Sequence, residues 1–222
     1  MKNLVIVTSI INTPDTPLSY ISTRSVFTRK ERFQQTKKTI ESIKDKIPDS
    51  KILIVDCTDF NEDENDYLLN NCDYILNLWN NKELHQNIFG LSKALGEGSQ
   101  TIMALKYIFS NNLIFENLFK VSGRYFLNDN FNIERFENDK LVFIPINGSI
   151  LNINTSIYKI PYKYTKKLHD YLVENINKMI DCIGYEVLMA LFLKNVNKEE
   201  IILYDKLGIE GRVSVSNDYY SS

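Results

Sequence analysis

The sequence predicts a single domain of mixed α/β fold, in which helices flank a mainly parallel β-sheet. Short runs of consecutive apolar residues, typical of strands buried on both faces, alternate with segments of helical periodicity in the first half of the chain. An Asn147-Gly148 pair separates two later apolar runs and is typical of a tight hairpin, so that part of the sheet should be antiparallel. The length of 222 residues and the 44% hydrophobic content are enough for one core, and no linker or repeat divides the chain.

The first half of the chain contains four predicted strands separated by helices and loops. Each strand is a continuous apolar run, and the helices have apolar residues three and four positions apart. Thr28 and Glu31 fit a capping box, which predicts a helix of about 16 residues that ends before Pro48. In chain order the elements are a strand at 4–7, a polar loop at 10–27, the capped helix, a strand at 51–56, an acidic linker at 61–66 ahead of a short helix, a strand at 73–78, a polar stretch at 80–90, a helix introduced by residues 96–100, and a strand at 118–122.

The second half has a different pattern, with a hairpin followed by helices. Apolar residues every four positions predict one helix across 168–180, and a second apolar face predicts another around 187–192. The remaining predicted elements are hairpin strands at 141–146 and 149–153, a last strand at 201–204 and a polar tail at 208–222.

Charge and cysteine content exclude several classes of protein. The formal net charge of -2 gives no overall attraction to nucleic acid or to an anionic membrane. Three cysteines without C-x-x-C spacing argue against a disulfide framework or a zinc site, so we expect buried thiols in a reducing compartment. His85 and His169 also lack metal-ligand spacing. No apolar run is long enough for a signal peptide or a transmembrane helix, and the expected location is cytoplasmic.

Ligands of open α/β sheets bind at the carboxyl ends of the strands, which identifies the first candidate residues. Thr8 and Ser9 follow the first strand, and Asp56 ends the second. Arg24, in the first loop, and the cations near the start of the first helix would favour an anion such as a phosphate. The alternative for the helix cations is a solvated helix start with ordinary surface arginines.

A small-residue segment, Gly96-Glu97-Gly98-Ser99-Gln100, is expected at the start of a helix, where free amides and close backbone approach would suit a ligand. It matches neither G-x-G-x-x-G nor a P-loop, and a plain glycine-marked turn explains it equally well. Lys93, Glu97 and Gln100 are three and four residues apart, so they would project from one helix face towards a polyhydroxylated substrate.

The end of the fourth strand is the most informative segment. Lys120 precedes Ser122-Gly123-Arg124, and Tyr125 follows. Two cations and a phenol would lie at the carboxyl end of the strand, where an arginine fork can bind a diphosphate through two hydrogen bonds. The alternative is a strand end with a salt-bridged arginine.

These segments in combination resemble small single-domain glycosyltransferases of the GT-A fold, of the kind encoded in surface-polysaccharide clusters and by some large DNA viruses. The segments that carry the resemblance are Val5–Ser9, Thr23–Phe27, Glu31–Thr36, Thr39–Ile43, Gly96–Gln100 and Lys120–Tyr125. The resemblance implies a transferase of polysaccharide biosynthesis that uses a nucleotide-sugar donor, with UDP favoured, and an oligosaccharide or glycan acceptor. It also implies a donor half at 1–127, an acceptor half at 128–222, and a bacterial or virus-infected host cytosol.

The sequence departs from this family at its metal site. A typical member has an Asp-x-Asp motif at the end of the fourth strand, and this chain has none anywhere. Bound Mn²⁺ or Mg²⁺ is therefore not supported, and we expect Arg124 with Lys120 to neutralise the diphosphate. Glu186 resembles the acidic residue beside the acceptor and is the expected catalytic base, although a carboxylate at a helix start also explains it. The expected donor-binding residues are Thr8, Ser9, Arg24, Asp56, Lys93, Glu97, Gln100, Lys120 and Tyr125.

Two other functions are compatible with this fold. A sugar nucleotidyltransferase would usually have a glycine-rich Lys/Arg signature after the first strand, and the first loop here contains no glycine. A non-catalytic carbohydrate- or nucleotide-binding protein would have retained the fold after losing the metal site, and it would catalyse no transfer. Slow hydrolysis of a donor distinguishes the enzyme from the binding protein, which should release no free nucleotide.

Overall fold

The computed structural model describes all 222 residues as ten strands and seven α-helices. The strands are β1 (Asn3–Thr8), β2 (Ser50–Asp56), β3 (Tyr74–Asn77), β4 (Asn117–Ser122), β5 (Tyr125–Leu127), β6 (Leu141–Ile146), β7 (Ser149–Pro161), β8 (Ile201–Leu203), β9 (Ile209–Arg212) and β10 (Tyr219–Ser221). The helices are α1 (Arg29–Lys46), α2 (Glu62–Asn71), α3 (Lys82–Phe89), α4 (Lys93–Ser110), α5 (Tyr162–Glu174), α6 (Ile176–Ile180) and α7 (Tyr185–Lys194). Short 3-10 helices lie at Ile133–Phe136 and Lys198–Glu200.

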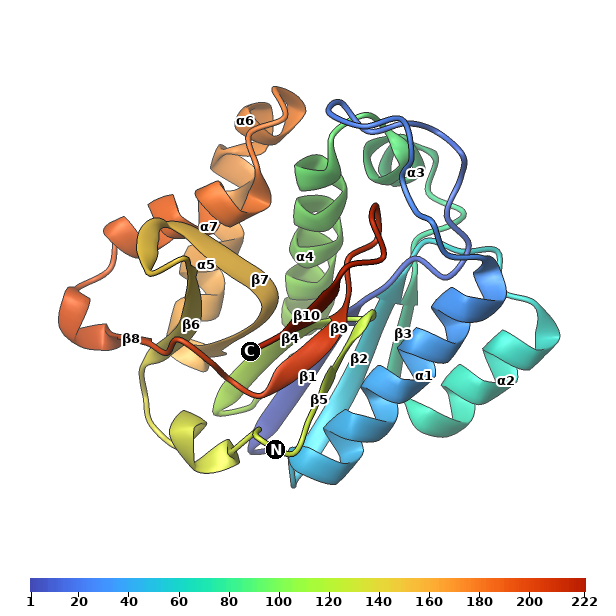
Figure 1. Ribbon diagram of the computed structural model, residues 1–222. Helices are drawn as coiled ribbons and strands as arrows, with labels where there is room; N and C mark the ends of the chain where they lie inside the picture. The colour runs from blue at the N-terminus through green and yellow to red at the C-terminus, as the bar shows by residue number, and fades with distance from the viewer.

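A seven-stranded sheet in the order β3-β2-β1-β4-β7-β6-β8 forms the centre of the molecule (Figure 1). The pairs β3-β2, β2-β1, β1-β4 and β6-β8 are parallel, and β4-β7 and β7-β6 are antiparallel. The predicted fold class, a mainly parallel mixed sheet flanked by helices, is therefore confirmed. The hairpin at Asn147-Gly148 is also confirmed, with both residues at positive φ as a tight turn requires.

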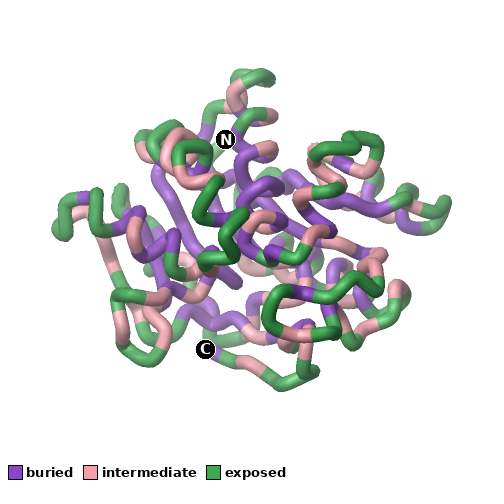
Figure 2. Tube along the Cα trace, turned by 90° about the horizontal axis from the view of Figure 1, so that it is seen from above, coloured by how far each residue is buried: buried purple, intermediate pink, exposed green.

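The central strands are apolar throughout because both faces of the sheet are covered. Leu4 and Ile6 of β1 belong to the core beneath α4, α5 and α7, whereas Val5 and Val7 belong to the core beneath α1. Successive side chains of a strand point to opposite faces, so a strand between two helix layers has no polar alternation. Figure 2 shows the consequence, with buried segments through the middle of the molecule and exposed segments around them.

The first helix begins as predicted. The Thr28 hydroxyl accepts a hydrogen bond from the Glu31 backbone N–H, and the Glu31 carboxylate accepts one from the Thr28 N–H at 2.8 Å. This capping box satisfies backbone donors that have no partner within the helix. The helix runs for 18 residues and ends at Lys46, before Pro48.

Several helix boundaries differ from the predictions. The acidic segment at 61–66 is not a linker, because Asn61 caps α2 and the acidic residues form its first turn. The polar stretch at 80–90 contains α3, whose apolar residues are too few to give a clear sequence signal. Ser92 caps α4, so residues 96–100 lie inside this helix and not at its start. The predicted helix at 168–180 is interrupted at Asn175 and forms α5 and α6.

A second sheet, of three strands, was not predicted. β5 pairs with β9, and β9 pairs with β10, all antiparallel. The tip of the β9-β10 hairpin rises towards the carboxyl ends of the central strands (Figure 1). The Ser214 hydroxyl donates to the Arg24 carbonyl at 2.9 Å, and the Val26 N–H donates to the Ser214 carbonyl at 2.9 Å. The C-terminal hairpin is thereby tied to the first loop.

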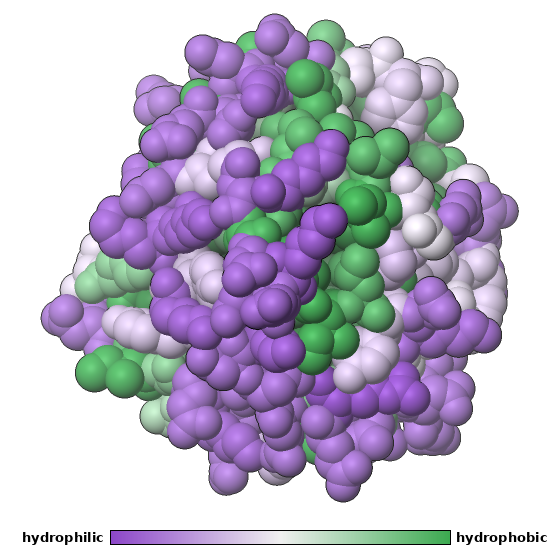
Figure 3. Space-filling view, turned by 90° about the vertical axis from the view of Figure 1, so that its left-hand side faces the viewer, coloured by the Kyte–Doolittle hydropathy of each residue, from purple (hydrophilic) through white to green (hydrophobic).

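One face of the molecule carries an apolar band amid polar side chains (Figure 3). This is the face formed by α5 to α7 and β6 to β8. The exposed large apolar residues of these elements are Ile150, Leu151, Tyr162, Val173, Ile180, Val187 and Leu203. Cys182, just before α7, is also exposed, which corrects the expectation that all the thiols are buried. No helix in the structure combines the length and hydropathy needed to cross a membrane.

Candidate functional site

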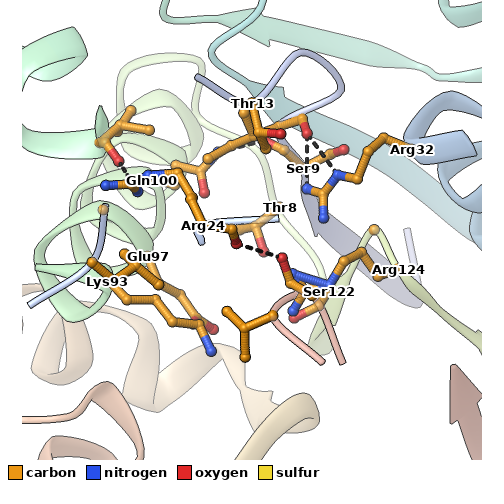
Figure 4. A pocket seen from close by; sticks show the side chains of 17 residues that line it. Thr8, Ser9, Thr13, Arg24, Arg32, Lys93, Glu97, Gln100, Ser122 and Arg124 are labelled. Atoms are coloured by element: carbon orange, nitrogen blue, oxygen red, sulfur yellow. Dashed lines mark hydrogen bonds between the residues drawn. The ribbon is translucent and has the colours of Figure 1, made fainter. Parts of the chain in front are cut away.

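A cavity, the main cavity, lies at the carboxyl ends of β1 and β4 (Figure 4). Six parts of the chain contribute to it: the end of β1 with its loop, α1, α3, α4, the end of β4 with the turn after it, and the C-terminal hairpin. The polar residues that line it are Thr8, Ser9, Thr13, Arg24, Arg32, Lys93, Glu97, Gln100, Ser122, Arg124 and Ser214. Of the predicted residues, it therefore brings together Thr8, Ser9, Arg24, Lys93, Glu97, Gln100 and Arg124.

A second cavity, the side cavity, is lined by residues of the first loop, α4 and the start of α7, including Glu186. Lys93 and Glu97 line both cavities, so the two share a wall on α4. Neither cavity is lined by Asp56, Lys120 or Tyr125. The site therefore contains the predicted catalytic pair, Arg124 and Glu186, in neighbouring cavities.

Two arginines that line the main cavity have N–H groups without a hydrogen-bond acceptor in the protein. Arg32 is 4% exposed, and its Nε and Nη2 donate to the Ile10 carbonyl at 3.0 and 2.8 Å. Its Nη1 is buried without a partner, as is Nε of Arg124. Burial, together with the charge of Arg124, lowers the pKa of Arg32 to about 9. Because buried N–H groups are normally paired, an anion held by both guanidinium groups would complete the site.

The backbone around Gly123 explains how Arg124 reaches this position. The Gly123 N–H donates to the Thr8 carbonyl at 2.8 Å, which draws the turn after β4 against the end of β1. A Cβ atom at Gly123 would lie 2.9 Å from Cβ of Ser9. The close approach of the two strand ends therefore requires a glycine directly before Arg124.

Replacing Gly123 by alanine should destabilise the protein by about 1 to 3 kcal/mol, because the added methyl group overpacks the contact with Ser9. Denaturant unfolding measures this change. Gly184→Ala is the matched control, since its new Cβ would have its nearest neighbour at 3.4 Å, an ordinary contact distance. Equal stability of the two variants would contradict this account of the turn.

Arg24 lines the main cavity but has a structural role. Its guanidinium donates to the carbonyls of Thr16, Ile88, Phe89 and Gly90, and burial lowers its pKa. These bonds hold the first loop against the end of α3 and leave the group little capacity for a ligand. The structure therefore places Arg24 in the cavity wall, as expected, but with its guanidinium already bound to backbone carbonyls.

Lys120 lies outside both cavities, and its ammonium is fully buried with all its donors bound within the protein. Nζ donates to Glu97 Oε1 at 2.5 Å, to the Ser122 hydroxyl at 2.9 Å and to the Thr155 carbonyl at 2.8 Å. An ammonium has three donors, so none is left for a diphosphate. The sequence predicted that Lys120 lies near the strand end, but it could not show that Glu97 of α4 forms an ion pair with it there.

Tyr125 does not line the site either. It belongs to β5, and its ring packs edge-on against Tyr220 with the ring centroids 5.9 Å apart. Gln100 does line the main cavity, but its Nε2 donates to the Ser9 carbonyl at 2.7 Å. Gln100 thus supports the end of β1 from α4.

Asp56 lies beneath the site and not in it. Its side chain is buried, and Oδ2 accepts a hydrogen bond from the Ile11 N–H at 3.2 Å. Burial raises the pKa of Asp56 to about 6, against the opposing effect of hydrogen bonds and of the Arg32 charge. Asp56 therefore holds the loop after β1 and lies outside the cavity in which contact with the donor was expected.

This raised pKa predicts a pH-dependent stability. The folded state favours neutral Asp56, so its contribution is complete below about pH 4 and is lost as the pH rises through about 6. Asp56→Asn stays neutral, so the stability of the variant relative to the parent should increase by up to about 3 kcal/mol between pH 4 and 7. Urea unfolding across this range measures it, and a difference that does not change with pH would contradict the assignment.

The C-terminal hairpin was missed as a part of the site, and Arg32 was expected only as one of the cations near the start of the first helix, not as a donor-binding residue. A signal for Arg32 existed: it lies four and eight residues before Thr36 and Ile40, on the buried face of α1. A buried arginine in such a stripe needs a partner, which points to a site. Ser214 and Val215 had no comparable signal, because only the pairing of β9 with β5 brings them to the cavity. No group of three or more His, Cys, Asp or Glu side chains is placed to hold a metal ion.

Comparisons with known proteins bear on the fold. No family model matches the sequence, and no curated protein matches it. Two crystal structures of the glycosyltransferase GlyE from Streptococcus pneumoniae TIGR4 are similar to this chain, one in the apo form at a TM-score of 0.55 and 10% identity, the other at 0.50 and 12%. Each match covers 92% of this chain and 45% of GlyE, so the chain spans less than half the length of that protein.

A glycosyltransferase involved in the glycosylation of the major capsid of PBCV-1 aligns over 92% of this chain and 83% of its own, at 9% identity and a TM-score of 0.49. At the identities found for GlyE, the likeness shows a shared fold. The chain therefore has a fold that glycosyltransferases also use.

Proposed function

We propose that the protein is a glycosyltransferase that moves a sugar from a nucleoside-diphosphate sugar to a glycan acceptor. The observation that carries this proposal is the pair of guanidinium groups, Arg32 and Arg124, each with a buried N–H that has no partner in the protein. They lie at the carboxyl ends of β1 and β4, on the opposite side of the main cavity from Lys93 and Glu97 (Figure 4). The fold shared with GlyE supports the same class of reaction.

The proposed chemistry is mainly electrostatic. When the bond between the sugar and the diphosphate breaks, its electron pair leaves on the phosphate oxygen, and preorganised donors stabilise the charge that develops there. Arg124 and Arg32 supply positive charge with planar donors that match phosphate oxygens. The residues at the end of β4, Ser122-Gly123-Arg124, do not fit a divalent cation, because a guanidinium has no lone pair to offer a metal. No step of the proposal passes through a metal ion.

The acceptor would enter through the side cavity. In an inverting transfer, the acceptor oxygen forms a bond to the anomeric carbon while the diphosphate leaves, and a carboxylate takes the acceptor's proton. Glu186 lines this cavity, and its carboxylate forms no ion pair or hydrogen bond in the protein. It is therefore free to accept that proton, which Glu97 is not, because Lys120 already binds Glu97.

The proposal assigns residues 1–127 mainly to the donor and 128–222 mainly to the acceptor. The main cavity is built from the first part, except for Ser214 and Val215, and the side cavity takes Glu186 from the second. We favour UDP as the nucleotide, because it is the commonest in the family that the sequence resembles. Polysaccharide biosynthesis in the cytoplasm is part of the same proposal.

A thermal-shift panel of UDP-, GDP-, dTDP- and CMP-sugars tests the proposal. A ligand at 100 times its Kd stabilises a native protein by about 2.7 kcal/mol, which for this size corresponds to a rise in Tm of roughly 5 to 10 °C. We expect one nucleotide series to give this rise, equally in manganese and in EDTA. No shift with any of the four series would overturn the proposed function.

A further inference from the structure

Glu97 occupies the wall between the two cavities because α4 packs unusually close to its neighbours there. A Cβ atom at Gly96 would lie 3.1 Å from the Ile88 carbonyl oxygen of α3, and one at Gly98 would overlap the Met179 side chain of α6. The two glycines therefore let α3 and α6 approach α4 on either side of Glu97. This explains the small-residue segment, which lies inside a helix and offers no free amides.

The Glu97 carboxylate is held at one oxygen and free at the other. Oε1 accepts from Lys120, whose other two donors bind Ser122 and Thr155. Oε2 has no partner in the protein, and 15% of the Glu97 side chain is exposed. Burial alone would raise the pKa of Glu97, but the charges of Lys120 and Lys93 hold it below its ordinary value. The carboxylate is thus ionised, fixed in direction and open to both cavities.

We infer that Glu97 selects the transferred sugar by its hydroxyl groups, and that Lys120 is the positioning residue that holds Glu97 for this task. The inference rests on the proposed function. A diphosphate at Arg32 and Arg124 would direct its sugar across the main cavity towards Glu97 and Lys93 (Figure 4). An ion-paired carboxylate is a weak base but a strong hydrogen-bond acceptor. Glu97 therefore binds hydroxyls, and the proton goes to Glu186.

Such a site rejects a sugar that lacks the recognised hydroxyl, because the charged group is then left without its partner. Loss of one hydrogen bond to a charged group should lower kcat/KM by about ten- to a hundred-fold. This loss in kcat/KM should depend only on which hydroxyl groups the sugar carries. Affinity for the free nucleoside diphosphate should not change.

The experiment compares the parent protein with Glu97→Gln, using the nucleotide that the thermal-shift panel selects. The probes are the free nucleoside diphosphate, its sugar conjugate, and conjugates that each lack one sugar hydroxyl. For the parent, at least one deoxy conjugate should lose about ten- to a hundred-fold in kcat/KM, as expected for one charged hydrogen bond. For Glu97→Gln, kcat/KM with the complete conjugate should be lower than that of the parent by a similar factor. Removing the sugar hydroxyl should then lower kcat/KM of this variant little further.

Lys120→Met tests the positioning role through the pH profile. Without the ammonium, the buried Glu97 carboxylate takes up a proton more easily, so transfer should fall at pH 6 and recover towards pH 8. Lys120→Arg keeps the charge and should restore activity at pH 6. Lys159→Met is the matched control, because Lys159 is equally buried but donates only to Asn138 and Lys140. Its pH profile should match that of the parent.

The outcomes separate this inference from the proposed function. If no nucleotide binds the parent protein, both fail. If nucleotide binds and sugar is transferred, but Glu97→Gln discriminates the deoxy conjugates as the parent does, only this inference is overturned. An unchanged pH profile in a folded Lys120→Met variant overturns the positioning role.

Discussion

Replacing Glu186 by glutamine should lower kcat for sugar transfer by about 10²- to 10⁴-fold, the usual contribution of a positioned proton acceptor. Glutamine has nearly the same shape but cannot take the proton of the acceptor hydroxyl. Glu186 lies in the side cavity, away from the arginines, so the Kd for the donor should remain that of the parent. Steady-state transfer assays and donor titrations measure the two quantities separately.

The matched control for Glu186 is Glu199→Gln, an exposed carboxylate of a short 3-10 helix that lines neither cavity. Its kcat should equal that of the parent. Transfer at the parental rate by Glu186→Gln would remove Glu186 from the mechanism. Asp181, which is exposed directly after α6, would then be the next carboxylate to replace.

Replacing Arg124 by alanine should weaken donor binding by roughly ten- to a hundred-fold, the effect of losing a charge-assisted hydrogen bond of about 1.5 to 3 kcal/mol. The Nε of Arg124 is buried without a partner in the protein, and a bound diphosphate would supply the missing acceptor. Arg124→Lys keeps the charge but loses the planar fork, and its affinity should fall between those of the parent and the alanine variant. Isothermal titration calorimetry with the selected nucleoside diphosphate measures the Kd of each variant.

Arg135→Ala provides the control for Arg124. Arg135 is exposed, and its guanidinium donates to the Lys206 carbonyl away from both cavities. Its removal should leave donor affinity unchanged. If chelation abolishes donor binding while Arg124→Ala keeps full affinity, a metal ion and not Arg124 binds the diphosphate.

The elements that were predicted correctly are those whose signal lies within the element itself. β1 could be found because both of its faces are buried, and α1 because a local capping box marks its start. The β9-β10 hairpin could not be found in this way. Its strands are three or four residues long, and its partner β5 is separated from it by about 80 residues, so only tertiary pairing defines it.

The site shows the same distinction. The place of Arg124 in the main cavity could be predicted because it lies two residues after β4, a strand that ends at the ligand-binding edge of the sheet. The role of Lys120 could not, because its position in the strand does not reveal that Glu97, on another element, engages its ammonium. The contacts of Arg24 could not be predicted for a related reason: its partners are backbone carbonyls, which no sequence pattern marks.

The most direct test of the central claim is the release of free nucleoside diphosphate from a nucleotide-sugar donor in the presence of EDTA. The parent protein should release it, slowly with water and faster with a glycan acceptor, and Arg124→Ala should release it at least ten-fold more slowly at subsaturating donor. Release that requires a divalent cation and proceeds equally in Arg124→Ala would contradict the account. Binding of the donor without any release would identify a binding protein.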